Sequence, residues 1–192
     1  MALNITILFG STRDGRLGFR YAKYLENAVK ARGHTVTLID PLEYDFPLLR
    51  KRFSDYKPGD QIPPKLVKLQ KILSDSDAFL LVSAEYNHLP PPALLNIMDH
   101  FLAEYAKKAS AIACYSAGPF GGVRAAISLR EFMGELGATA ISKTLPCPAV
   151  QNAFDENGKP ADEAAWKKRS DEFIEQLEFN ANALKSARGQ KA

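Results

Sequence analysis

The sequence predicts an α/β fold in which a five-stranded parallel sheet carries helices on both faces. The main observation is that short apolar runs alternate with longer amphipathic runs, five times along the 192 residues. The apolar run at 77–83 is continuous, as expected of a strand buried on both faces. Hydrophobic residues make up 46% and charged residues 24%. This ordinary globular composition, with no repeat or linker, predicts a single domain over residues 1–192.

The first half of the chain is predicted to hold two complete strand–helix units and a third strand. These are a strand at 4–9, a helix at 19–32, a strand at 34–40, a helix at 64–73 and a strand at 77–83. The first helix has apolar residues at helical spacing from Phe19 to Val29, and Gly33 is well placed to end it. Residues 41–63, rich in proline and aromatic residues, are expected to form a long ordered loop.

The second half continues the alternation. It is predicted to hold a helix at 92–107, a strand at 109–115, a helix at 122–136, a strand at 138–145, a loop at 146–160 and a closing helix at 161–185. Prolines are tolerated in the first turn of the helix at 92–107, and Gly137 ends the helix at 122–136. The small, polar tail 186–192 is expected to be frayed.

Charge and cysteine content limit the classes of function. The net charge is +3, and no Lys/Arg run is interleaved with aromatics, so no nucleic-acid partner is expected. No apolar stretch approaches the roughly 20 residues of a membrane span, and the start lacks a signal-peptide pattern. Cys114 and Cys147 are too few for a disulfide scaffold. His34, His88 and His100 lack metal-ligand spacing. We therefore expect a soluble, cytoplasmic protein with no metal site and no membrane partner.

The segment 10–18, Gly-Ser-Thr-Arg-Asp-Gly-Arg-Leu-Gly, carries the strongest functional signal. It follows the first apolar strand and precedes the first helix. Such a loop offers backbone N–H groups and the positive end of the helix dipole, to which Arg13 and Arg16 add full charges. The segment therefore predicts a phosphate site, although an ordinary strand-to-helix turn with surface arginines is the alternative reading of the loop alone.

Two familiar phosphate loops do not match this segment. The dinucleotide fingerprint needs a second glycine where Ser11-Thr12 stands. The P-loop needs Lys and Ser/Thr after Gly15, where the sequence has Arg16-Leu17. A loop with hydroxyls and arginines but no metal ligand suits a terminal monophosphate held by direct hydrogen bonds.

Two further loops leave predicted strands at the same edge of the sheet. The segment 83–92 sets an aromatic and three polar side chains against a stiff proline run, which suits the wall of a site for a flat heteroaromatic ring. In the segment 115–124, Gly121-Gly122 at a helix start allows close backbone approach to a ligand. Each loop alone also fits an ordinary turn. Because the carboxyl ends of parallel strands share one edge, all three loops can meet one ligand.

These three loops together resemble the NAD(P)H-dependent FMN reductases of flavodoxin-like fold, a group that includes quinone, azo-dye and chromate reductases. The resemblance rests on Gly10–Gly18, on Glu85-Tyr86-Asn87-His88 and on Gly121-Gly122-Val123-Arg124-Ala125, and it extends from Asn4 to about Val150. It implies a three-layer sandwich with strand order 2-1-3-4-5. It also implies bound FMN, NADPH or NADH as electron donor, and a homodimer or homotetramer with the flavin near the subunit boundary.

The resemblance also implies the cofactor-binding residues. The FMN phosphate would contact Ser11, Thr12, Arg13, Arg16, Leu17 and Gly18. The flavin ring would lie against Ala84, Glu85, Tyr86 and Asn87, with Ser116, Gly118, Phe120, Gly121 and Gly122 closing the other side. No catalytic side chain is expected because FMN carries the chemistry; Tyr86 and His88 are candidate helpers. The sequence departs from the family pattern at Ala84, where proline is usual, and at Leu89, where glycine is common.

The function that follows is a two-electron, ping-pong reduction of a quinone-like acceptor through bound FMN. One alternative is an enzyme that treats FMN as a diffusible substrate. Another is a flavodoxin-type electron carrier, although such carriers are usually strongly acidic and this chain has a net charge of +3. Outside the three loops, Asp40 is expected to cap the turn before Pro41, and Trp166 is expected in the core or an interface.

Overall fold

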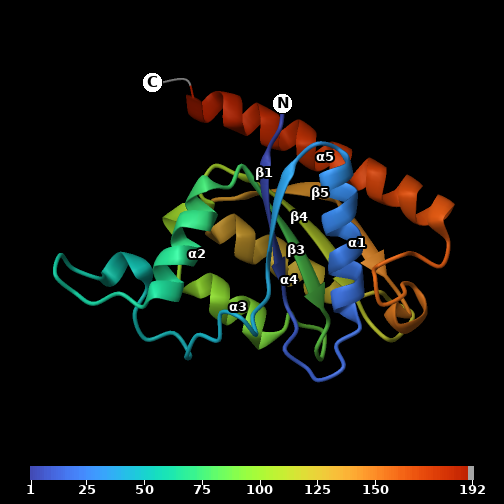
Figure 1. The fold of residues 1–192 in the computed structure, drawn as a ribbon, viewed down its shortest axis with the longest axis horizontal. Coiled ribbons are helices and arrows are strands. Elements are labelled where there is room, and N and C mark those ends of the chain that lie inside the picture. The colour runs from blue at the N-terminus through green and yellow to red at the C-terminus, as the bar shows by residue number, and fades with distance from the viewer. Residues whose placement is uncertain (190–192) are drawn as a thin grey trace.

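The computed structural model describes residues 1–189 and contains the predicted sheet, with strand order β2-β1-β3-β4-β5 (Figure 1). The strands are β1 (Asn4–Phe9), β2 (Thr35–Ile39), β3 (Ala78–Ala84), β4 (Ala109–Tyr115) and β5 (Thr139–Cys147). Every neighbouring pair is parallel. The predicted flavodoxin-like topology is therefore confirmed. All strands direct their carboxyl ends to one edge, where ligands bind in such sheets.

Helices cover both faces of the sheet (Figure 1). Helices α1 (Gly18–Ala31) and α5 (Glu163–Gly189) lie on one face, and α2 (Pro64–Asp75), α3 (Pro92–Asp99) and α4 (Val123–Glu135) on the other. Each face has its own apolar core. Along β3, Leu80 and Val82 pack under α1 and α5, while Phe79 and Leu81 pack under the other three helices. This double burial explains the continuous apolar run in the sequence.

Helix α3 is shorter than predicted. It ends at Asp99 and not at Lys107, and a 3₁₀ turn at Ala103–Tyr105 follows. The backbone carbonyl of His100 accepts a 2.8 Å hydrogen bond from the N–H of Phe53 in the long loop. This contact occupies a carbonyl that a continuing helix would use. The apolar spacing beyond residue 99 therefore reflects burial in an irregular segment.

Helix α5 is longer than predicted. Residues 186–189 of the expected frayed tail are helical, and residues 190–192 lie outside the described part of the chain. Two ion pairs to Asp77 at the start of β3 anchor this end. Lys185 Nζ lies 2.7 Å from Asp77 Oδ2, and Arg188 lies 3.5 Å from Asp77 Oδ1. Arg188 therefore has a partner that is distant in the sequence.

The segment 41–63 is an ordered loop, as predicted, with one 3₁₀ turn at Phe53–Asp55. It extends beside α2 and α3 at the left of Figure 1. Asn96 on α3 holds it, because the Asn96 amide donates to the carbonyl of Phe46 at 3.1 Å and accepts from the N–H of Leu49 at 3.1 Å. The loop therefore packs against its own chain.

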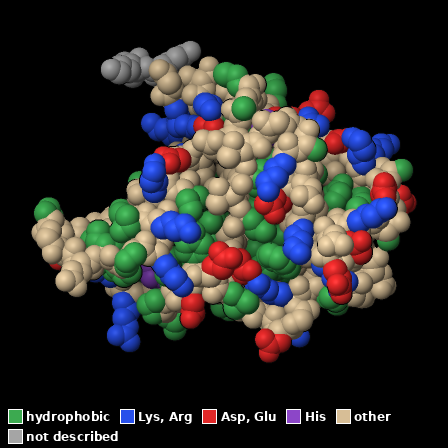
Figure 2. Space-filling model, in the orientation of Figure 1, with side chains coloured by type: hydrophobic (Ala, Val, Ile, Leu, Met, Phe, Trp, Pro, Cys, Tyr) green, Lys and Arg blue, Asp and Glu red, His purple; other side chains and the backbone are tan. Residues whose placement is uncertain are grey.

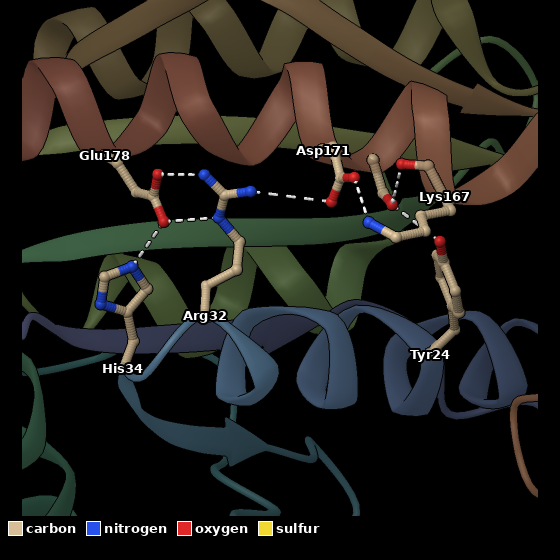
Figure 3. Close-up of polar contacts among 7 residues, drawn as sticks. Tyr24, Arg32, His34, Lys167, Asp171 and Glu178 are labelled. Atoms are coloured by element: carbon tan, nitrogen blue, oxygen red, sulfur yellow. Dashed lines mark hydrogen bonds and ion pairs between the residues drawn. The ribbon is translucent and has the colours of Figure 1, made fainter.

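A group of polar contacts joins the turn between α1 and β2 to α5 (Figure 3). Arg32 donates from Nε and Nη2 to the two carboxylate oxygens of Glu178, both at 2.6 Å, and His34 Nε2 lies 2.7 Å from Glu178 Oε1. The N–H of Leu3 donates to His34 Nδ1, which assigns the ring proton to Nε2. The hydrogen bond from Arg32 is the main cause of a lowered pKa at Glu178, and His34 acts in the same direction.

We predict that Glu178→Gln lowers the free energy of unfolding at pH 6 by about 1 kcal/mol, because the charge-assisted bonds are lost. A carboxylate with a lowered folded-state pKa stabilises the protein above its ordinary pKa of 4.5, and that contribution is lost as the pH falls through the folded-state value. The difference between variant and wild type should therefore shrink toward pH 3.5 in urea unfolding.

The matched control is Glu131→Gln, at an exposed glutamate on α4. It should change stability little at either pH. If Glu178→Gln lowered the free energy of unfolding by the same amount at both pH values, the role of the Glu178 charge would be contradicted.

Candidate functional site

The carboxyl ends of β1, β3 and β4 surround a pocket of about 390 Å³. Its walls come from the first two predicted loops, from the start of the third, and from the turn after β5. The lining residues are Ser11, Arg13, Asp14, Gly15, Arg16, Leu17, Gly18, Ala84, Glu85, Tyr86, Tyr115, Ser116, Ala117, Val150 and Gln151. The expected meeting of three loops at one edge of the sheet is thus confirmed.

The loop 10–18 leaves its backbone donors open. Helix α1 begins at Gly18 without a side-chain cap, and within residues 1–189 nothing accepts a hydrogen bond from the N–H groups of residues 14–18. Gly15 adopts a φ of 65°, which L side chains rarely adopt. Unpaired N–H groups at a helix start form an anion-binding concavity.

Arg16 is already engaged within the protein. Its guanidinium forms a two-pronged ion pair with the carboxylate of Asp40, with Nη1 2.6 Å from Oδ1, and Nη1 also donates to the carbonyl of Ser11 at 2.8 Å. The Asp40 carboxylate also accepts from the N–H of Leu42, which confirms its expected role as a cap of the turn. Arg16 therefore ties the loop to the end of β2, and its expected contact with phosphate remains a prediction.

Arg13 differs from Arg16 in its surroundings. Its side chain is exposed, and its guanidinium carbon lies 5.9 Å from the centre of the Tyr86 ring. It forms no ion pair with another residue in the described range 1–189. Arg13 therefore offers the pocket a charge that no residue in this range neutralises.

The loop after β3 contains a tight turn. Asn87 and His88 both have positive φ, 52° and 72°, and Tyr86 and Leu89 exchange backbone hydrogen bonds of 2.9 and 3.0 Å across them. Two successive residues of this conformation form a hairpin turn of the type that favours Asn-Gly. The turn carries Asn87 and His88 away from the pocket wall, whereas Tyr86 remains in it, its hydroxyl 2.7 Å from Ser11 Oγ.

Glu85 lies in the pocket wall, but its carboxylate is bound to the start of helix α4. Its carboxylate, 9% exposed, accepts from the N–H groups of Arg124 and Ala125 at 2.9 and 3.3 Å. An acidic group at the start of a helix satisfies donors that would otherwise lack partners and interacts favourably with the helix dipole. Glu85 thus fixes the second loop to the start of α4.

The glycine pair of the third loop serves close packing. A Cβ atom on Gly122 would lie 2.7 Å from the backbone nitrogen of Tyr115, and one on Gly121 would lie 3.0 Å from Pro148. The pair therefore packs against the ends of β4 and β5. Of the sequence-predicted cofactor residues, those outside the pocket wall are Thr12, Asn87, Gly118, Phe120, Gly121 and Gly122.

Tyr115 begins the predicted third loop, but it is the main pocket residue that was not among the predicted cofactor contacts. Its side chain stacks on Phe9, with ring centres 6.3 Å apart and planes 6° apart, and only 6% of the residue is exposed. Its hydroxyl has no hydrogen-bond partner within residues 1–189. The available signal was an aromatic residue at the end of a strand, directly before the glycine-rich loop.

Val150 and Gln151, which follow β5, were also missed, because only the loops after the first, third and fourth strands were predicted to form the site. Together the pocket offers unpaired N–H groups, one free guanidinium and an unpartnered phenol, next to a wall formed by Ala84 and Tyr86. These features fit a ligand that carries both a phosphate and a flat ring.

Comparison with known proteins defines the class. Several oxidoreductases of known structure share the flavodoxin-like sheet. Residues 3–152 match the family model described as NADPH-dependent FMN reductase. Because the match spans well over half of the chain, the protein belongs to this oxidoreductase family. None of the curated proteins matches the sequence.

Three solved structures illustrate the likeness. FerB, a flavoenzyme NAD(P)H:(acceptor) oxidoreductase from Paracoccus denitrificans, is 20% identical with a TM-score of 0.75, covering 94% of this chain and 98% of that one. An NAD(P)H:quinone oxidoreductase from Methanothermobacter marburgensis is 13% identical with a TM-score of 0.59, covering 95% and 100%. Flavodoxin 1 from Bacillus cereus is 18% identical with a TM-score of 0.54, covering 90% and 97%. At these identities the likeness establishes the fold.

No helix within residues 1–189, the part of the chain that the structure describes, combines the length and the apolar character that a membrane span requires.

We predict that Arg16 and Arg13 differ in their effect on stability. Arg16→Ala leaves the Asp40 carboxylate, 11% exposed, without its partner, and should lower the free energy of unfolding by about 3 kcal/mol. Arg13→Ala removes an exposed, unpaired side chain and should change it by less than about 0.5 kcal/mol. Urea unfolding of flavin-free protein measures both, and equal losses in the two variants would contradict the assignment.

Proposed function

We propose that this protein is an FMN-containing oxidoreductase that takes electrons from NADPH or NADH and passes them in pairs to a small quinone-like acceptor by a ping-pong mechanism. Membership of the FMN reductase family supports the reaction class. The observation that carries the proposal is the pocket itself, because an anion site at the start of α1 adjoins an aromatic wall at the end of β3. This is the combination that a flavin with a terminal phosphate requires.

The residues present can be assigned to parts of the cofactor. The phosphate would lie on the N–H groups of residues 14–18, with Arg13 as charge partner. The ring would lie between Ala84 and Tyr86 on one side and Ser116 and Ala117 on the other. When bound, FMN supplies the two-electron chemistry, and the protein supplies position and electrostatics.

The side chains of the pocket act by orienting and by donating hydrogen bonds. The Ser11 hydroxyl holds Tyr86 by a 2.7 Å hydrogen bond, so the Tyr86 ring keeps a defined position in the wall. The N–H of Ala117 is bonded to no other residue in the range 1–189 and can donate to an electron-rich ring edge. No side-chain acid is required, and Tyr86 is the candidate proton donor that lies in the pocket wall.

The charge distribution favours an enzyme over an electron-carrier flavodoxin. The net charge is +3, and Figure 2 shows basic and acidic side chains interspersed over the visible face. A carrier that docks on a basic partner would present one acidic field. The buried free thiols of Cys114 and Cys147 are compatible with a reducing compartment, which we propose to be the cytoplasm.

The absorption spectrum of the purified protein, followed by anaerobic addition of NADPH, tests the proposal. We expect protein-bound FMN that NADPH reduces directly and that a quinone reoxidises, with parallel-line steady-state kinetics. Failure to take up FMN on titration would overturn the proposal. Loss of FMN on gel filtration, with free reduced FMN as product, would favour the diffusible-substrate alternative. One-electron reduction without oxidation of NADPH would favour the electron carrier.

We further propose that the protein forms a homodimer or homotetramer through the start of α4. Phe120, Val123 and Ile127, which are 59%, 37% and 62% exposed, form an apolar stripe there. Glu85 joins this end of α4 to the pocket, so the flavin would lie near the subunit boundary. Exposed apolar patches of this kind mark interaction surfaces.

Sedimentation velocity tests this assembly. We predict that Ile127→Lys shifts the protein to a monomer, because a buried charge without a partner destabilises an apolar contact. The control is Val67→Lys, at a 44% exposed position on α2, which should leave the oligomer unchanged. A wild-type monomer at micromolar concentration, or an oligomer retained in Ile127→Lys, would be inconsistent with this surface.

A further inference from the structure

The hydroxyl of Tyr115 is a buried polar group for which the described residues provide no hydrogen-bond partner. The residue is 94% buried, given its 6% exposure, and its hydroxyl has no partner within residues 1–189. Buried hydroxyls are almost always hydrogen-bonded, because an unpaired one loses its bonds to water without compensation. Phenylalanine would fill the same space and stack on Phe9 without that penalty. A bound ligand that accepts a hydrogen bond from the hydroxyl would remove this free-energy cost.

Two glycines from different loops make room for this tyrosine. A Cβ atom on Gly18 would lie 2.0 Å from Tyr115 Cζ and 2.4 Å from its hydroxyl oxygen. A Cβ atom on Gly122 would lie 2.7 Å from the backbone nitrogen of Tyr115. The hydroxyl end of the ring therefore rests against the start of α1, at the end of the loop whose N–H groups are unpaired. The Tyr115 hydroxyl is therefore placed to contact an anion that binds to this loop.

The other polar side chains near this hydroxyl already have partners. Ser11 Oγ is bonded to the hydroxyl of Tyr86 at 2.7 Å. Arg16 is paired with Asp40 and with the carbonyl of Ser11. By contrast, the hydroxyl of Tyr115 and the guanidinium of Arg13 form no hydrogen bond or ion pair within residues 1–189, so both are free to meet an anion.

We propose that the Tyr115 hydroxyl donates a hydrogen bond to the phosphate of the flavin, and that it is thereby a determinant of the preference for FMN over riboflavin. The inference rests on the proposed function, since it concerns the same pocket. It assigns the phosphate site a donor from the end of β4 in addition to the loop 10–18. Because Arg16 is paired with Asp40 and with the carbonyl of Ser11, we assign it the role of a residue that positions the loop.

The protonation state of Tyr115 supports this role. Burial, with a smaller effect of the neighbouring Tyr86, raises the pKa of Tyr115 well above its ordinary value, although the nearby Ser11 hydroxyl and the charges of Arg16 and Arg13 act in the opposite direction. The phenol therefore keeps its proton at neutral pH. A neutral O–H group next to a phosphate dianion is a donor only, and the hydrogen bond is charge-assisted.

Removal of the hydroxyl tests the proposal. Tyr115→Phe keeps the ring, so the pocket shape is preserved. We expect its affinity for FMN to fall roughly tenfold to a hundredfold, as for a hydrogen bond to a charged group, and its affinity for riboflavin to change less than about twofold. Fluorescence titration of each flavin into the flavin-free protein measures both dissociation constants.

The stability of the flavin-free protein provides the second readout. A hydroxyl without a partner contributes nothing to the folded state, so Tyr115→Phe should be as stable as the wild type or more stable. A structural hydroxyl would instead show a loss on removal. Tyr105→Phe is the matched control, because this fully buried tyrosine lies in the opposite core and should leave both flavin affinities unchanged.

The outcomes separate the two proposals. A wild type that binds neither flavin overturns the proposed function. If the wild type binds FMN and Tyr115→Phe binds it equally well, only the assignment of Tyr115 is wrong. An equal loss for FMN and riboflavin would show that the hydroxyl contacts the part that the two flavins share, which also overturns the assignment to the phosphate.

Discussion

The position of the site depends on one constraint of the sheet. Both faces of β3 and β4 are buried, so no residue of these strands can present a polar side chain to a ligand except at the end. In a parallel sheet, the carboxyl ends of all strands lie at the same edge, where backbone groups and loop side chains are free of the core. Ala84, Glu85, Tyr115 and Ser116 lie at this transition. The pocket lies at the edge of the sheet, where helices no longer cover both faces of the strands.

Tyr115 links the loops that surround the pocket. The glycine at the start of α1 and the glycine before α4 both leave space for it, the first at its ring and the second at its backbone. The first and third loops therefore cannot take positions independently of each other. Glu85 extends the connection to the second loop by bonding the start of α4. The pocket is thus held in shape before any ligand binds, which reduces the ordering cost of binding.

The same contacts explain why several residues that suggest ligand binding in the sequence serve the protein itself. Arg16 has the charge and position of a phosphate ligand, yet it is paired with Asp40 at the end of β2. The carboxylate of Glu85 satisfies donors of α4. The groups that residues 1–189 leave unpaired near this loop include the backbone N–H groups of residues 14–18, the guanidinium of Arg13 and the hydroxyl of Tyr115. Anion recognition then depends mainly on backbone geometry and less on full charges.

The order of strands and helices, the two-sided burial of the sheet and the loops at its carboxyl edge were predictable from the sequence, because apolar periodicity and glycine positions act over a few neighbouring residues. The end of α3, the length of α5 and the partners of Arg16, Glu85 and Tyr115 were not. Each of these depends on a contact between segments far apart in the chain, such as Phe53 with His100 or Asp77 with Lys185. The local sequence shows which charged and polar groups need a hydrogen-bond or ion-pair partner. Only the packing of the tertiary structure decides which partner lies close enough to bind.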